Sequence, residues 1–326
     1  MIDVHAHYLP PSLLDRAGAD SGLVVGYDAE ERRLSFPAGP SRPVPAPLTD
    51  LVTRSGWNAQ RSIHLQVLSP WLDVAGDDLE GDDAVRWTAA MNDATAADIE
   101  GNVGFGAFAA LPVVDGGAAA AELRRTVTEL GFLGGSIPTQ VGGRNLDDAG
   151  LDPLFAAATE LRVPLFIHPH RVLGAERLSK DFLTNVCGNP FETTVAALSL
   201  FFDGTFDRYP DLKILLAHCG GTLPMLAGRA VRAVAAGAAS RRGAENADEI
   251  LNCFTYDTVV HDPGVLAFGI ARLGHDRLVL GTDYPFPMLV DDPIDLVRQA
   301  LVATGEDAHG FDHITRVGPA KLLGLG

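Results

Sequence analysis

The chain opens with Met1-Ile2-Asp3-Val4-His5-Ala6-His7, a short apolar strand that ends in two histidines with one residue between them. Side chains in an extended strand alternate between the two faces, so His5 and His7 point the same way, about 7 Å apart along the chain. Two imidazoles at this spacing can converge on one metal ion. An isolated pair is also compatible with a polar strand terminus, so its meaning depends on the rest of the chain.

After this strand the chain alternates between strand-like and helical segments. Further strands are expected at residues 63–68, 103–109, 135–139, 164–168, 212–218, 250–256 and 278–283, most of them followed by a helix. Several are continuous apolar runs, which are typical of parallel strands buried on both faces. Eight such units predict an α/β fold of one domain, residues 1–326, built as a distorted (β/α)₈ TIM barrel. A doubly wound open sheet is the alternative, but no glycine-rich phosphate loop follows the first strand.

One segment departs from this alternation. Residues 22–47 contain two short β-type runs, 23–27 and 33–36, and then a proline-rich loop. We therefore expect a small β-hairpin inserted after the first strand.

Composition limits the classes of function. The chain has 42 acidic and 25 basic residues and a formal net charge of −17, which argues against nucleic acid as a partner. No stretch approaches the roughly 20 apolar residues of a membrane span, and the N-terminus does not have the pattern of a signal peptide. The three cysteines (Cys187, Cys219 and Cys253) are scattered, as expected for reduced thiols in a cytoplasmic protein.

Four predicted strands end in histidine or aspartate, and their chemistry is uniform. The residues are His5 and His7, then His168, His218 and Asp283. Catalytic groups of TIM barrels lie at the carboxyl ends of the strands, so these side chains should meet at one rim. As accidental strand caps, the whole set would be improbable.

We expect this rim to hold one divalent ion, Zn²⁺ in the first place, with Mn²⁺ as an alternative. The expected ligands are His5, His7, His168 and Asp283. His218 is better suited to act as a base beside metal-bound water, because a further ligand would leave less room for water or substrate. A second ion would need a bridge such as a carbamylated lysine, and none of the three lysines lies at residues 135–139.

With these residues placed, the chain resembles the amidohydrolase superfamily, and most closely its aminocarboxymuconate-semialdehyde decarboxylase branch. The similarity runs over nearly the whole chain. Its strongest points are Asp3-Val4-His5-Ala6-His7, Gly142-Gly143-Arg144-Asn145-Leu146-Asp147-Asp148, Ile167-His168-Pro169, His218-Cys219-Gly220-Gly221 and Gly281-Thr282-Asp283-Tyr284-Pro285-Phe286-Pro287.

The resemblance implies the same four metal ligands, with His218 activating the metal-bound water. It implies non-oxidative decarboxylation of a small aromatic or muconate-type carboxylic acid. Asp283 or the activated water would supply the proton to carbon. It also implies a homodimer or higher homo-oligomer, in which Arg229 enters the neighbouring site. Arg42 matches a substrate-carboxylate arginine, and His170 and Phe286 would line the pocket.

Other functions remain open at this point. His170 replaces the usual aromatic residue after His-Pro, and residues 181–190 lack the tryptophan of the parent decarboxylase, so the substrate is not defined. A hydrolase or hydratase of a cyclic or unsaturated acid, lactone or amide would need the same five residues. A non-catalytic binding protein on a retained barrel is a third possibility.

Overall fold

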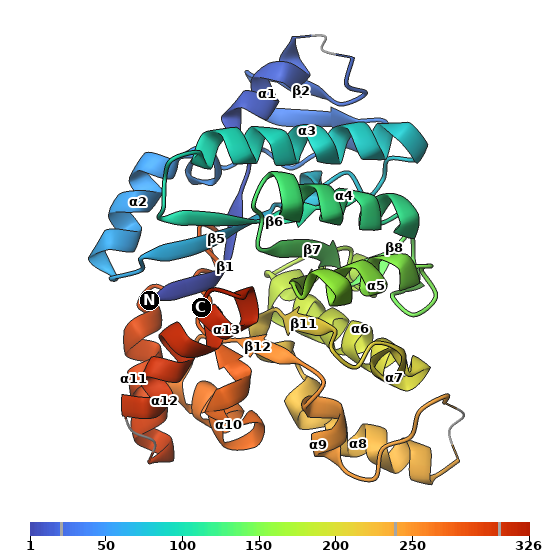
Figure 1. Cartoon of the computed structure of the whole chain (residues 1–326), viewed down its shortest axis with the longest axis vertical. Helices are drawn as coiled ribbons and strands as arrows, with labels where there is room; N and C mark the ends of the chain where they lie inside the picture. The colour runs from blue at the N-terminus through green and yellow to red at the C-terminus, as the bar shows by residue number, and fades with distance from the viewer. Residues whose placement is uncertain (20–21, 238–239, 306–307) are drawn as a thin grey trace.

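The computed structural model describes residues 1–19, 22–237, 240–305 and 308–326. Eight parallel strands form its central sheet, in the order in which they occur along the chain (Figure 1). They are β1 (Ile2–Tyr8), β5 (Leu65–Pro70), β6 (Phe105–Ala110), β7 (Gly134–Pro138), β10 (Pro164–His168), β11 (Lys213–Leu216), β12 (Thr255–Asp257) and β13 (Leu278–Val279). The segment after β13 returns to β1, where the N–H of His7 donates to the carbonyl oxygen of Tyr284 at 2.7 Å. The predicted TIM barrel is thereby confirmed.

Helices surround this sheet, as expected for a (β/α)₈ fold (Figure 1). None of the helices in the described ranges is long and apolar enough to cross a membrane. They are α1 (Pro11–Gly18), α2 (Leu51–Gln60), α3 (Gly81–Ile99), α4 (Gly116–Glu129), α5 (Asp152–Leu161), α6 (Asn189–Asp203), α7 (Thr205–Arg208), α8 (Leu223–Ala235), α9 (Ala247–Leu251), α10 (Pro263–Leu273), α11 (Pro293–Thr304), α12 (Ala308–Asp312) and α13 (Gly318–Leu323).

The inserted segment forms a small antiparallel sheet at one end of the molecule, beside α1 and α3 (Figure 1). Its strands are β2 (Gly26–Asp28), β3 (Arg33–Phe36) and β4 (Gly39–Pro40), so it contains one short strand more than the expected hairpin. The Phe36 ring packs edge-on against Trp87 of α3, with 5.6 Å between the ring centroids. This apolar contact joins the insertion to the barrel's outer helices. A second short hairpin, β8 (Gln140–Val141) with β9 (Arg144–Asn145), follows β7.

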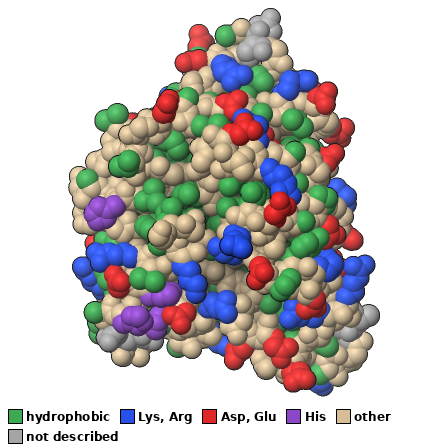
Figure 2. All heavy atoms as spheres, in the orientation of Figure 1, with side chains coloured by type: hydrophobic (Ala, Val, Ile, Leu, Met, Phe, Trp, Pro, Cys, Tyr) green, Lys and Arg blue, Asp and Glu red, His purple; other side chains and the backbone are tan. Residues whose placement is uncertain are grey.

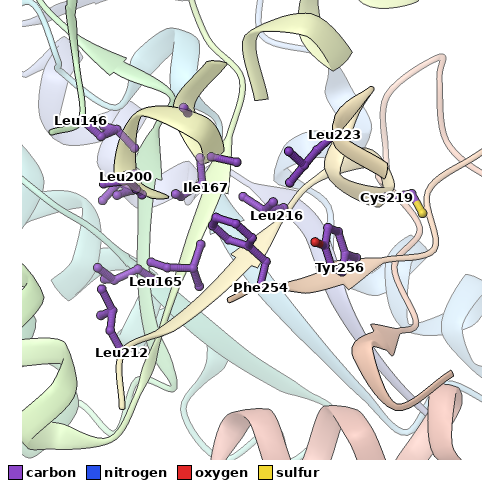
Figure 3. Close-up of a cluster of buried hydrophobic side chains, with 14 of the residues drawn as sticks. Leu146, Leu165, Ile167, Leu200, Leu212, Leu216, Cys219, Leu223, Phe254 and Tyr256 are labelled. Carbon is purple, nitrogen blue, oxygen red and sulfur yellow. The ribbon is translucent and has the colours of Figure 1, made fainter. Parts of the chain in front are cut away.

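The core has two layers because side chains alternate along each strand. Leu165 and Ile167 of β10 belong to the cluster between the sheet and its helices, together with Leu200 of α6 and Leu223 of α8 (Figure 3). Phe166 lies in a separate buried cluster formed mainly by strand residues. His168 is two residues beyond Phe166 and so shares its face. The alternation therefore directs His168 toward the barrel interior.

Three elements differ from the sequence prediction. Residues 247–251 form α9, with the Asn246 side chain accepting the first N–H groups, so only the end of the strand expected at 250–256 exists. Helix α2 was not predicted; the Asp50 side chain caps it by accepting from the N–H of Thr53. The sequence predicts one final helix over residues 311–323, but the structure divides this part of the chain among α12, a wider turn at residues 313–317, and α13.

Charged side chains of both signs are interspersed over the face in view (Figure 2). Many form exposed ion pairs, such as Arg124–Glu160 at 2.6 Å and Arg272–Asp248 at 2.7 Å. Exposed pairs of this kind typically contribute about 0–1 kcal/mol each. The fold therefore depends on the buried apolar layers rather than on these pairs.

Candidate metal centre

The structure brings together the four residues that were predicted as metal ligands. The Nε2 atoms of His5 and His7 are 3.1 Å apart, and Asp283 Oδ1 lies 3.4 Å from the first and 3.2 Å from the second. With a nitrogen of His168 included, all four ligand atoms lie within 4.8 Å of one another. These residues come from β1, from the end of β10 and from the segment after β13, which are far apart in the sequence.

Two atoms of this cluster have no hydrogen-bond partner among the described residues, although they are buried. They are His168 Nε2 and Asp283 Oδ1. The other ring nitrogen of His168, Nδ1, is 3.1 Å from the carbonyl oxygen of Pro169, so it can carry the proton and leave the lone pair on Nε2. Burial of unpaired acceptors is costly unless a cation satisfies them. Three imidazoles and one carboxylate therefore fit a borderline divalent ion.

The electrostatics of His168 and Asp283 agree with this fit. Burial, helped by the neighbouring imidazoles, holds the pKa of His168 well below its usual value, so the ring is neutral. Burial acts to raise the pKa of Asp283, but its close contacts with the imidazoles of His218, His5 and His7 outweigh this effect and hold that pKa well below the usual range. The site thus presents a carboxylate and an uncharged imidazole, the forms that bind metal ions.

His218 stands beside the four ligands rather than among them. Its Nε2 is 3.8 Å from Asp283 Oδ2, and its ring centroid is 5.2 Å from that of His168. His218 and Cys219 have φ angles of +56° and +53°, in the left-handed region that side chains rarely adopt, and Asp283 has a φ of +61°. Such backbone strain is concentrated at functional sites, where the surrounding structure maintains it.

The two glycines after His218 serve packing. The sequence predicts that Gly220 and Gly221, which follow His218, leave space for a substrate to approach. A Cβ on Gly220 would lie 2.6 Å from the Tyr256 ring, and one on Gly221 would lie 1.9 Å from the carbonyl oxygen of Pro190. The protein itself fills the space where a Cβ would lie, so packing alone requires glycine at both positions.

Asp257, at the end of β12, was missed by the sequence reasoning. Its carboxylate is 2.5 Å from His5 Nδ1, and it also accepts the main-chain N–H groups of His218 at 3.0 Å and Cys219 at 2.9 Å. The bond to Nδ1 turns Nε2 of His5 toward the other ligands. The available signal was its place at a strand end, but the expected strand stopped one residue earlier, at 256.

We expect Asp257→Asn to weaken metal binding by about 10- to 100-fold, the usual effect of removing a partner that orients a metal ligand. The amide has nearly the same volume but cannot accept from His5 and both main-chain donors as the carboxylate does. Competition with a chromophoric chelator would measure the affinity. Asp248→Asn, at an exposed aspartate paired with Arg272, is the matched control. Equal affinity in the two variants would contradict the role assigned to Asp257.

A model described as amidohydrolase matches residues 2–309, which is most of the chain. The chain belongs to this amidohydrolase family. The family assignment agrees with the resemblance predicted from the strand-end motifs.

Named members of the amidohydrolase family are similar to this chain over different lengths. The 2-amino-3-carboxymuconate-6-semialdehyde decarboxylase of Dictyostelium discoideum is 31% identical over 337 residues, covering 99% of this chain and 93% of that protein. The gamma-resorcylate decarboxylase of Rhodococcus jostii is 33% identical over 206 residues, covering 56% and 60%. Among solved structures, a dihydroxybenzoic acid decarboxylase from Polaromonas sp. with bound manganese and 2-nitroresorcinol has a TM-score of 0.78 at 24% identity, covering 99% of this chain and 96% of that one. This last likeness concerns the fold.

Of the substrate-binding residues expected in this amidohydrolase, Phe286 lies beside the metal centre and Arg42 is paired with a carboxylate. The Phe286 ring lies 5.0 Å from that of His7 and 6.0 Å from that of Trp71, so it adjoins the metal centre. Arg42 stacks over Trp71 at 5.5 Å and donates to both carboxylate oxygens of Asp73. Its charge is therefore already matched by a carboxylate.

The other two expected residues differ in their surroundings. The side chain of His170 is largely buried and faces two carboxylates, with its Nε2 at 3.5 Å from Asp77 Oδ2 and its Nδ1 at 3.9 Å from Asp73 Oδ1. Arg229 is exposed on α8, and no contact in the described part of the chain joins it to the ligand cluster. The roles of these two residues in substrate binding stay predictions.

Proposed function

We propose that this amidohydrolase is a metal-dependent carboxy-lyase that decarboxylates a small aromatic or muconate-type acid without oxidation. The observation that carries the proposal is the buried cluster of His5, His7, His168 and Asp283 with His218 beside it. The names of the relatives support the reaction class, since the similar proteins from Dictyostelium and Rhodococcus are both decarboxylases.

We assign the four clustered side chains as ligands of one divalent ion. Their imidazole-rich chemistry favours Zn²⁺, while the manganese in the similar Polaromonas structure supports Mn²⁺ as the alternative. When bound, the ion would supply Lewis-acid chemistry, polarising substrate oxygens and offsetting negative charge as CO₂ leaves.

The chain's own residues would manage the proton. In the overall reaction the C–C bond to the carboxylate breaks, CO₂ departs, and a proton takes its place on carbon. His218 Nε2, 3.8 Å from Asp283 Oδ2, is placed to hold and pass on that proton. Histidine is suited to this because its pKa lies close to neutral pH. We therefore assign His218 and Asp283 as the catalytic residues.

Substrate contacts follow from the neighbouring side chains. Phe286 beside His7 offers an apolar wall for a planar ring. We assign His170 and Arg42 to the polar rim of the same pocket, where Asp73 lies between them. Because Arg229 is exposed on α8, we propose that it acts at the site of a second copy in a homodimer or higher oligomer. The three free cysteines favour a cytoplasmic location.

Removal of the metal is expected to abolish turnover, because both substrate placement and charge compensation depend on it. The protein would be dialysed against a chelator and then reloaded with Zn²⁺ or Mn²⁺ in separate samples. CO₂ release from hydroxybenzoic and muconate-type acids would be measured in parallel with hydrolysis of lactones and amides. CO₂ release that persists in the metal-free protein would contradict the metal requirement. Hydrolysis without loss of a carboxyl group from any acid would favour the hydrolase alternative.

A further inference from the structure

Arg54 of α2 is a buried cation directly behind the metal centre. The whole residue is 0% exposed. One terminal nitrogen donates to the carbonyl oxygen of His7 at 2.5 Å, the other donates to Gln66 Oε1 at 3.1 Å, and the guanidinium lies 4.5 Å from the centre of the Tyr284 ring. Burial lowers the pKa of Arg54 to about 10, so it remains charged at neutral pH. A fully buried charge is costly to maintain and therefore calls for an explanation.

Direct ion pairing does not provide that explanation. Within the residues described, no carboxylate lies within 4.0 Å of the guanidinium nitrogens of Arg54, although surface arginines such as Arg42 and Arg86 form such pairs. The cation instead contacts two segments that carry metal ligands. It holds the main chain of His7 on one side and the ring of Tyr284, the residue after Asp283, on the other.

A second connection runs from Arg54 through buried side chains. Gln66 Nε2 donates to Asp3 Oδ2 at 2.7 Å, and Thr282 Oγ1 donates to the same oxygen at 2.7 Å. The other oxygen, Asp3 Oδ1, accepts the main-chain N–H of His5 at 3.1 Å. The network that begins at Arg54 thus reaches the main chain of the ligand His5 and the side chain of Thr282, the residue before the ligand Asp283.

The charges of this buried region also involve Arg54. Three carboxylates, those of Asp3, Asp257 and Asp283, are buried in this region. The fully buried guanidinium of Arg54 is connected to Asp3 through Gln66 and contacts Tyr284, the residue after Asp283. With one divalent ion at the four-ligand cluster, the formal charge of this set would be zero. A divalent ion would balance two of the three carboxylates, and the guanidinium of Arg54 would balance the third.

We propose that Arg54 is a positioning residue of the metal centre, which holds the end of β1 and residues 282–284 at the separation that lets their ligands meet. The guanidinium acts through main chain and through Tyr284 and does not itself ligate. The inference rests on the metal centre of the proposed function but not on the reaction catalysed there. The prediction about metal affinity can therefore be contradicted while the carboxy-lyase assignment stands. Conversely, the carboxy-lyase assignment can be contradicted while the role of Arg54 stands.

The test measures metal affinity in Arg54→Met and Arg54→Lys, by competition of Zn²⁺ or Mn²⁺ with a chromophoric chelator. Methionine fills much of the volume but removes the charge and both hydrogen bonds, so we expect a loss of at least about 10-fold. Lysine keeps the charge but lacks the planar fork, and it should recover part of that loss. Gln66→Leu, which interrupts the path to Asp3 and leaves Arg54 in place, should give a smaller loss and is available if Arg54→Met does not fold.

A control separates positioning from general destabilisation. Leu154→Ala removes buried apolar volume from α5, in the cluster between sheet and helices, and its loss of thermal stability can be matched to that of the Arg54 variants. Unchanged metal affinity in Leu154→Ala with a loss in Arg54→Met would support the proposal. An equal loss in both would reduce Arg54 to a stabilising residue, and unchanged or tighter binding in Arg54→Met would overturn the proposal.

Discussion

His218→Asn is expected to lower kcat by about 10²- to 10⁴-fold while leaving metal content unchanged. That range is the usual contribution of a positioned acid or base. Asparagine can still make hydrogen bonds but cannot take up and release a proton near neutral pH. It is also one of the few residues that tolerate the left-handed backbone found at this position, so the main-chain N–H bonds to Asp257 can persist.

Two measurements on the same preparation check this expectation. The bound metal would be determined by elemental analysis and kcat by CO₂ release. His261→Asn, at an exposed histidine in the loop after β12, is the matched control and should behave as the wild type. Metal loss together with activity in His218→Asn would instead make His218 a ligand. Near-normal kcat would remove it from the proton path.

Asp283→Asn is expected to remove both the metal and the activity. Asp283 supplies the single carboxylate of the four-ligand cluster, and an amide oxygen is a much weaker ligand for a borderline divalent ion. Asparagine again tolerates the positive φ of this residue, so the loss should not come from backbone strain. We expect His5→Ala to give the same result, because it removes an imidazole from the centre of the cluster.

Metal content after dialysis decides this second prediction, with retention expected to fall by more than about 10-fold in both variants. Asp291→Asn, an exposed aspartate in the loop before α11, provides the control for a change of charge near the same rim. Wild-type metal content in Asp283→Asn or in His5→Ala would contradict the ligand assignment.

The metal centre was predictable because strand geometry is strongly constrained. The alternation of side chains put His5 and His7 on one face, and the parallel barrel brought the ends of β1 and β10 to one rim. The short length of β12, which spans only Thr255–Asp257, was harder to predict. Residues 247–251 contain apolar positions that suit a strand or a helix, and the capping Asn246 decided for the helix. Asp257 was missed for a different reason, because the expected strand ended at residue 256, one residue before it.

Contacts between distant loops were beyond sequence reasoning. Arg42 was expected at the substrate, and nothing in its local sequence indicated that Asp73 would pair with both arms of its guanidinium. The buried position of Arg54 likewise depends on the placement of α2, which brings the guanidinium to the main chain of His7, and α2 itself was not predicted. Such pairings depend on tertiary packing, which overrides local propensity.

The carboxylate of Asp257 holds both the imidazole of His5 and the tight turn that bears His218. The metal ligand His5 and the proposed proton-transfer residue His218 are therefore held by the same carboxylate, so a shift of one is expected to shift the other. An attempt to re-engineer this protein for a larger or smaller ion by moving His5 would also displace His218. A variant with a changed metal preference should consequently also show a changed rate of proton delivery, because Asp257 positions both His5 and His218.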